Sequence, residues 1–346
     1  MRVVLKSLVV FAGALILSSC STINHVRIET YNPAEVTFPS DVKNVLIVNN
    51  AVPQPDSVGY VYIMGGLLQD TSRVKADSAL FDACKHLGET MVDAHFFNDV
   101  LLYNGNTRRD TSFTEDKPLT PIGIDSLCAI TGADAVISLD QILFSTTRNV
   151  SFFAEGYVEG TIAAYSTALY RSYVPGKSKH LAEIVVNDSL FWDESAESLK
   201  DLNQIIPDPE NTLREIARDI ASKATLNFVP HWLEETRWYY SNMGTSWKEA
   251  TALAASKKWS DARKVWMNIY DSSRGWKSKA EAASNIALCY EIESKLTDAY
   301  EWAHRSYQLY VEHKDQSAEM TRQTNYVQSL ATRLRADKKL NLQLGE

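Results

Sequence analysis

The chain changes its pattern of hydrophobic residues about two thirds of the way along. Before Pro230, short runs of strand-forming residues alternate with helical stretches, whereas only helical periodicity remains from Trp247 onward. A chain of 346 residues is long enough to build two cores. We therefore predict an α+β protein, with a mixed-sheet α/β domain over 41–230 followed by an all-α helical domain over 235–346.

The first domain shows the element order β-α-β-α-β-β-β-α. The continuous apolar run Val45–Val48 is typical of a strand that is buried on both faces. In the segment that follows, Leu80, Cys84, Leu87 and Met91 share one helix face. We expect the helices to cover one face of a mixed sheet. The expected strands cover 44–50, 99–103, 133–144, 156–174 and 180–192, and the expected helices cover 76–95, 120–132 and 207–230.

The helical domain repeats its own pattern. Ala262 and Ala299 occupy equivalent positions 37 residues apart, close to the period of about 34 residues in tetratricopeptide repeats. Small residues at such positions let the two helices of a hairpin approach closely. The segment resembles about two tetratricopeptide repeats, closed by a capping helix over 315–341. A generic pair of helical hairpins is the alternative.

The N-terminus carries the pattern of an export signal. Arg2 and Lys6 precede an apolar stretch over 8–17, which is short of the roughly 20 residues that a spanning helix needs. The sequence Leu17-Ser18-Ser19-Cys20 resembles the lipobox of bacterial lipoproteins. This resemblance implies a signal peptide over 1–19, acylation of Cys20 with chains such as palmitate, a tether over 20–40, and an outer-membrane anchor that faces the periplasm. The alternatives are an ordinary secretory signal and a buried N-terminal helix.

Charge and cysteine content narrow the functional classes. The chain has 35 basic and 43 acidic residues and a net charge of −8, which argues against nucleic-acid binding. Beyond Cys20, the residues Cys84, Cys128 and Cys289 lie in apolar helical patterns. Their odd number and wide spacing disfavour a disulfide framework. We expect buried free thiols, and a Cys84–Cys128 bridge remains open.

The first domain also resembles a known family. Val45–Val48, the helix Leu80–Val92 and the stretch Gly132-Ala133-Asp134-Ala135-Val136-Ile137 are similar to the periplasmic α/β domain of curli-assembly lipoproteins and to the amino-terminal domain of the translocation protein TolB. The resemblance covers roughly 41–228. With its signal and its helices, the whole chain resembles an uncharacterised family of tetratricopeptide-repeat envelope lipoproteins. No amphipathic membrane-inserting hairpin pair is evident, so the resemblance does not extend to pore formation.

No catalytic or metal-binding motif stands out. Gly65-Gly66 lacks the lysine of a P-loop, and neither His-Glu-x-x-His nor Gly-x-Ser-x-Gly occurs. Cys84 and His86 would supply only two ligands of a zinc site. We therefore expect no metal, no cofactor besides the lipid, and no enzymatic activity. A cell-wall or glycan enzyme would require convergent carboxylates, for which Asp140 and Glu159 are the candidates.

The aromatic cluster Trp232, Trp238, Tyr239 and Tyr240 lies between the two predicted domains. We expect these side chains to pack between the domains, and an exposed platform for a protein or a sugar is the alternative.

These observations favour a protein that works by binding. We expect a membrane-anchored scaffold or adaptor in the bacterial cell envelope, because helical hairpins stack into surfaces suited to peptides and partner helices. The candidate contact residues are Trp276, Trp247 and Tyr290, with the exposed helix faces near 247–256 and 281–292. The alternative is an oligomeric assembly or secretion component related to the curli-assembly lipoproteins. The partners are then the membrane, through the lipid, and envelope proteins, with a homo-oligomer as a further possibility.

Overall fold

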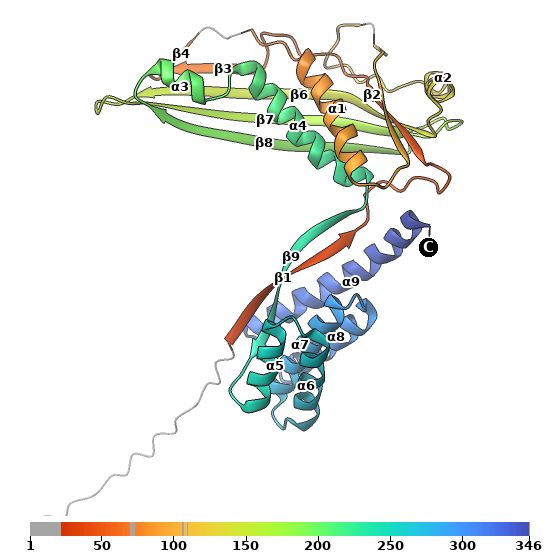
Figure 1. The fold of residues 1–346 in the computed structure, drawn as a ribbon, viewed down its shortest axis with the longest axis vertical. Coiled ribbons are helices and arrows are strands. Elements are labelled where there is room, and N and C mark those ends of the chain that lie inside the picture. The colour runs from red at the N-terminus through yellow and green to blue at the C-terminus, as the bar shows by residue number, and fades with distance from the viewer. Residues whose placement is uncertain (1–21, 70–72, 106, 109, 346) are drawn as a thin grey trace, which may run out of the picture. The chain divides into compact units, whose positions relative to one another are not determined.

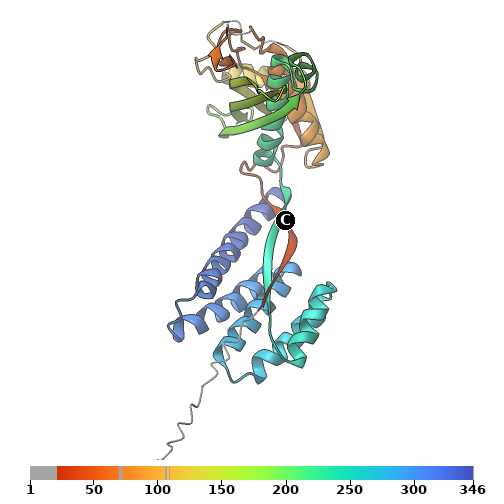
Figure 2. The ribbon, with the colours of Figure 1, turned by 90° about the vertical axis from the view of Figure 1, so that its left-hand side faces the viewer.

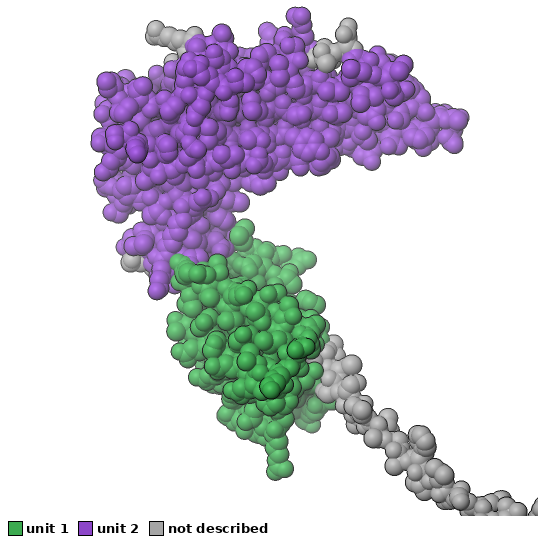
Figure 3. All heavy atoms as spheres, turned by 180° about the vertical axis from the view of Figure 1, so that it is seen from behind, with its two compact units in different colours: residues 1–30, 233–335 green, residues 31–232, 336–346 purple. Residues whose placement is uncertain are grey.

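A computed structural model describes residues 22–69, 73–105, 107–108 and 110–345 (Figure 1). The chain forms two compact units (Figure 3). Unit 1 comprises Met1–Thr30 and Leu233–Arg335, and unit 2 comprises Tyr31–Trp232 and Ala336–Glu346. The predicted fold class is confirmed, because a mixed β-sheet with helices precedes an all-α region of packed helices.

A seven-stranded sheet organises unit 2 around its longest strand, β6. Two shorter strands lie end to end along one edge of β6: β2 pairs with its first residues and β3 with its last, both in parallel. The other edge of β6 pairs antiparallel with β7, which pairs with β8. The strands are β2 (Asn44–Asn49), β3 (Tyr60–Met64), β4 (Leu67–Leu68), β5 (Asp99–Tyr103), β6 (Ala135–Phe152), β7 (Val158–Tyr173) and β8 (Ala182–Ala196).

Helices cover both faces of this sheet, and not one face as the sequence analysis predicted. Helices α1 (Asp77–Asp93) and α4 (Pro209–Phe228) pack against each other and on one face (Figure 1). The shorter α2 (Pro121–Thr131) packs on the other face against Leu46 and Val48. Successive residues of a strand point to opposite faces, so the apolar side chains of β2 pack against helices on both faces of the sheet.

Local capping explains where the helices of unit 2 begin and end. The Thr120 hydroxyl accepts a hydrogen bond from the Gly123 backbone N–H at 3.2 Å, and Asp208 does the same for Asn211 at 2.9 Å. Gly132 ends α2 with φ 75°, a left-handed conformation that suits glycine. The short helix α3 (Leu199–Ile205) and the β3–β4 hairpin were not predicted.

The segment assigned to a tether contains a strand. Residues Thr22–Asn32 form β1, which pairs with β9 (His231–Ser241) in a separate two-stranded ribbon. Thr30 of β1 donates a hydrogen bond to the Glu235 carboxylate of β9 at 3.0 Å. Figures 1 and 2 both show this ribbon running alongside the helices of unit 1.

The helices of unit 1 form successive antiparallel hairpins with a repeated turn. Lys257 and Ser294, 37 residues apart, both adopt the left-handed conformation, with φ 59° and 58°. The residue after each of them is a lysine that donates its backbone N–H to the carbonyl five residues earlier: Lys258 to Leu253 and Lys295 to Tyr290. Within the described residues, no helix combines the length and the hydropathy needed to cross a bilayer. The helices are α5 (Thr245–Ala255), α6 (Trp259–Ser272), α7 (Trp276–Ile292), α8 (Leu296–Glu312) and α9 (Ala318–Leu344).

Candidate functional site

The three predicted contact residues differ in their exposure. Trp247 is only 7% exposed and belongs to the core of unit 1, so its side chain offers no contact surface. Tyr290 is half-buried beneath the Arg263 guanidinium, which lies 4.2 Å from the ring centroid. Trp276 begins α7 and is half-buried, with its ring stacked on His313 at 4.4 Å.

Helix α7 offers no exposed face, because nearly every residue from Ala280 to Glu291 is buried. Strand β9 occupies one side of this helix. The Asn285 side chain accepts a hydrogen bond from the Tyr240 backbone N–H and donates one to the Tyr240 carbonyl, both at 2.7 Å. An extended segment of the same chain therefore fills a helix face that would otherwise be available to a peptide.

Three of the four clustered aromatic residues belong to the core of unit 1. Trp238, Tyr239 and Tyr240 pack with its helices, and Gln323 of α9 donates a hydrogen bond to the Tyr240 hydroxyl at 3.1 Å. Trp232 is 65% exposed.

A buried carboxylate ties β9, α7 and α9 together. Glu291 accepts hydrogen bonds from Arg237 at 2.9 Å and from Arg333, and from the Tyr326 hydroxyl at 2.8 Å. Burial lowers the pKa of Arg237, but the hydrogen bonds and charge of Glu291 outweigh it and hold the pKa above its usual value. Burial, followed by the charge of Glu291, raises the pKa of Tyr326 well above its ordinary value. One feature of the sequence pointed to this network: polar residues occur inside the alanine-rich helix α7.

A row of partly exposed aromatic side chains lies on α8, a helix for which no contact residue was predicted. Tyr300, His304 and Tyr307 are half-buried and follow one face of the helix at i, i+4 and i+7. Each neighbouring pair of rings has its centroids 6.0 Å apart. A shallow hollow of about 310 Å³ lies along the same helix, lined by Tyr300, Glu301, His304, Arg305 and Gln308.

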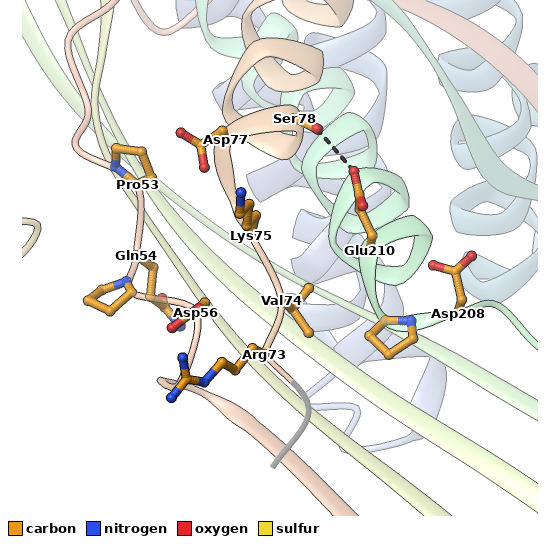
Figure 4. Close-up of a pocket in the computed structure, with 12 residues that line it drawn as sticks. Pro53, Gln54, Asp56, Arg73, Val74, Lys75, Asp77, Ser78, Asp208 and Glu210 are labelled. Carbon is orange, nitrogen blue, oxygen red and sulfur yellow. Dashed lines mark hydrogen bonds between the residues drawn. The ribbon is translucent and has the colours of Figure 1, made fainter.

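A hollow of about 940 Å³ lies in unit 2 (Figure 4). It lies where α1 and α4 begin, beside the loop that follows β2. Figure 4 shows that the Ser78 hydroxyl from α1 meets the Glu210 carboxylate from α4, at 3.1 Å. Two cationic and four anionic side chains line it, and all are at least partly exposed to solvent. These are Arg73, Lys75, Asp56, Asp77, Asp208 and Glu210.

The two candidate carboxylates for a cell-wall or glycan enzyme, Asp140 and Glu159, lie far apart. Asp140 sits at a bulge in β6, where it accepts hydrogen bonds from Arg171 at 2.7 Å and from Ser138 at 2.6 Å. Glu159 pairs with Ser151 of β6. Ser151 lies ten residues beyond Gln141, which is the neighbour of Asp140 in that strand. At a rise of about 3.3 Å per residue, roughly 33 Å separates the two positions.

Arg171 also anchors the loop residues 110–119. Its guanidinium holds Asp116 through two hydrogen bonds, at 2.6 and 2.7 Å, and this contact keeps the pKa of Asp116 below its usual value. Asn50 donates a hydrogen bond to Asp140 at 2.9 Å and another to the Lys117 carbonyl at 2.8 Å. The loop therefore covers the carboxyl ends of the parallel strands, a common location for ligands in α/β sheets.

Cys84, Cys128 and Cys289 are free and buried. Among the residues that the structure describes, no group of three or more His, Cys, Asp or Glu side chains is arranged to hold a metal ion.

Two family models match the chain. The model described as Domain of unknown function (DUF8603) matches residues 42–240, which is more than half of the chain, and the one described as Domain of unknown function (DUF6340) matches residues 248–332. No curated protein matches the chain. The first match contains the sheet of unit 2 together with β9, and the second contains most of the helical hairpins.

Proposed function

The chain belongs to the DUF8603 family, and we propose that it is a non-enzymatic bacterial lipoprotein that binds other proteins of the cell envelope. In this proposal Cys20 carries the lipid, residues 1–19 are removed, and the chain faces the periplasm from the outer membrane. The support is the basic and apolar N-terminus that ends in Leu17-Ser18-Ser19-Cys20.

The proposal treats the helices of unit 1 as a tetratricopeptide-like scaffold. Its support is the turn repeated at Lys257 and Ser294, and the fully buried alanines Ala262 and Ala299 at equivalent positions of α6 and α8. Stacked hairpins of this kind present rigid surfaces to partners. The proposed likeness of unit 2 to the curli-assembly and TolB domains rests on a parallel β2–β6 pair with helix α1 between them in sequence.

We place the contact surface on α8, because β9 covers α7. The observation that carries this choice is the stripe formed by Tyr300, His304 and Tyr307. Aromatic side chains with one polar end provide large contact areas with few rotatable bonds, and they are enriched at protein interfaces. A stripe with helical spacing, beside a shallow hollow, suits an amphipathic helix of the partner. Trp276 remains a second candidate contact at the beginning of α7.

Site-specific photo-crosslinking in the bacterium tests this surface. A crosslinking amino acid at position 307 should capture a discrete envelope protein, whereas one at position 243 should not, although Met243 is 91% exposed in the same unit. Capture of the same proteins at both positions would show non-specific contact. No capture at 300, 304 or 307 would reject the α8 surface. Truncation after residue 234 is unsuitable, because it removes all the helices of unit 1 and leaves β1 without most of its partner strand β9.

Membrane fractionation tests the anchor separately. The native chain should sediment with outer membranes, and Cys20→Ser should shift it to the soluble periplasmic fraction, because the thiol that is acylated is lost. Equal membrane retention of the two proteins would reject lipid anchoring through Cys20.

A further inference from the structure

One face of the sheet in unit 2 is uncovered along β6, β7 and β8. Helices α1 and α4 pack on the opposite face, α2 covers the end near Val136 and Tyr173, and at the border of the uncovered region Gln141 donates a hydrogen bond to the Phe113 carbonyl at 2.9 Å. Cross-strand partners share a face, and none of the side chains in these rows is buried. We call this surface the open face. Its rows are Gln141–Leu169–Val185, Leu143–Thr167–Asn187, Ser145–Tyr165–Ser189, Thr147–Ala163–Phe191 and Asn149–Thr161–Asp193.

The open face is almost free of charge in an acidic unit. Asp193, at a corner, is the one charged residue among these fifteen positions, and the next row of the same face, Ser151–Glu159–Ser195, adds Glu159. Residues 31–232 as a whole contain 27 acidic and 15 basic residues. The excess negative charge of unit 2 therefore lies elsewhere on its surface.

The centre of the open face has the composition of an interface. Tyr165 lies in the middle row of the middle strand and is 48% exposed, and its ring meets that of Phe191 edge to face at 5.7 Å. Phe191 and Val185 are 65% and 58% exposed. Protein interfaces are rich in such aromatic residues and poor in Asp, Glu and Lys.

The size of the open face is close to what a weak dimer needs. Each position on one face of a sheet covers about 32 Å², from a repeat of about 6.6 Å along the strand and a strand spacing of about 4.8 Å. The fifteen positions thus cover roughly 480 Å² of flat sheet. Protruding side chains increase the accessible area above this value. A standard interface buries about 800 Å² of accessible surface on each partner.

We propose that the open face is a self-complementary interface, on which two copies of this chain pack face to face across a two-fold axis near Tyr165. Two acidic units repel each other wherever their charged surfaces meet, so a neutral face is the surface on which they can pair. A basic partner would bind the acidic surfaces instead. Lateral addition at the edge of β8 is opposed by Lys223, whose ammonium group donates to the Asn187 carbonyl at 2.9 Å. This interface goes beyond the proposed function and does not depend on it.

Analytical ultracentrifugation of the non-acylated chain that begins at Ser21 tests the dimer. The mass should double between low-micromolar and near-millimolar concentration. Phe191→Lys should weaken dimerisation at least tenfold, because it places a charged group in the apolar centre of the interface, and tenfold corresponds to about 1.4 kcal/mol. Phe81→Lys is the matched control: Phe81 is 51% exposed on α1 and its substitution should leave the dimer unchanged. A monomer at every concentration, a larger ring, or equal effects of both substitutions would overturn the proposal.

Crosslinking tests the position of the axis. Packed sheets lie about 10 Å apart, so a thiol-specific crosslinker of that span should join two copies of Tyr165→Cys. The native thiols beyond Cys20 are buried, and burial raises the pKa of Cys84 to about 12, which keeps the background low. Phe81→Cys should give no covalent dimer. Equal crosslinking of the two variants, or none at position 165, would contradict the face-to-face arrangement.

Discussion

Each unit buries an ion cluster, and the two clusters differ in composition. In unit 1, the buried carboxylate of Glu291 lies between the guanidinium groups of Arg237 and Arg333, and Arg237 also pairs with the partly exposed Glu235. In unit 2, one guanidinium lies among three carboxylates: Arg171 with Asp116, Asp140 and Glu183.

The clusters also differ in their access to water. The Glu291 side chain is 0% exposed and its arginine partners are 8% and 16% exposed, so this cluster is part of the core. In unit 2 the side chains of Asp116 and Glu183 are 52% and 44% exposed, although Arg171 and Asp140 are buried. The first cluster joins elements of the core to each other, whereas the second ties a loop and an outer strand to the core. A substitution should therefore cost more in unit 1, where water cannot replace the missing partner.

The largest effect is expected for Glu291→Ala. It leaves Arg333 without its counterion and Arg237 with only the partly exposed Glu235, and it should lower the free energy of unfolding by about 3–5 kcal/mol. Urea denaturation followed by tryptophan fluorescence measures this, because six of the eight tryptophans lie in unit 1. Glu293→Ala, which removes a carboxylate that is 20% exposed, is the control. A loss below that of the control would show that the Glu291 cluster does not stabilise the core.

A smaller loss, about 2–4 kcal/mol, is expected for Arg171→Met. It leaves Asp140 buried without its cation, while water solvates the two exposed carboxylates. Hydrogen exchange in β6 and β7 measures the effect. Adding Asp140→Leu to the same chain should recover part of the loss, because the unpaired charge is removed. No recovery would mean that the loss comes from packing.

Asn285→Ala tests the neutral contact beside the unit 1 cluster. Loss of the amide leaves the Tyr240 backbone N–H and carbonyl unpaired in the core, at a cost of about 1–3 kcal/mol for each group that stays unsatisfied. We expect a total near 2 kcal/mol in the same fluorescence assay. Asn285→Asp keeps the acceptor but sets a carboxylate oxygen against the Tyr240 carbonyl, so it should cost more than Asn285→Ala, and a smaller loss would contradict the assigned hydrogen bonds.

The smallest effect, below about 1 kcal/mol, is expected for Asp116→Asn, because an exposed carboxylate is screened by water. The hydrogen bonds from Arg171 lower the pKa of Asp116 in the folded state. Its contribution is therefore complete above the unfolded pKa of about 3.9 and is lost as the pH falls through the lower folded value. The difference in melting temperature between the native chain and Asp116→Asn should narrow below about pH 4. A difference that widens with acid would have the wrong sign.

Elements with local signals were predictable from the sequence. The apolar run of β2, the one-sided pattern of α1 and the Thr120–Pro121 beginning of α2 each depend on neighbouring residues, and all three elements are present. The spacing of Ala262 and Ala299 likewise identified two helical hairpins, because close helix packing requires small residues at fixed positions.

Elements that depend on distant partners were not predictable. Strand β1 has a weak alternating pattern of its own, and it exists because β9 pairs with it from about 200 residues further along the chain. The same cause hid the role of Asn285, whose partner is the backbone of Tyr240. The stripe on α8 was missed because Tyr300 and Tyr307 look like core residues until the neighbouring helices are placed.

The β1–β9 pair has a consequence for how the protein is made. Thr30 and Leu233 lie beside each other, with the Thr30 hydroxyl 3.4 Å from the Leu233 carbonyl, so the main segment of unit 2 is a guest inserted between two adjacent strands of a host. The host consists of the described residues up to Thr30 and of Leu233–Arg335, which include α9 up to Arg335. During synthesis from the N-terminus, β1 cannot pair with β9 until the whole inserted segment has been made. The guest can fold early, because its sheet closes within one continuous stretch of chain, whereas completion of the host is the slow, long-range step.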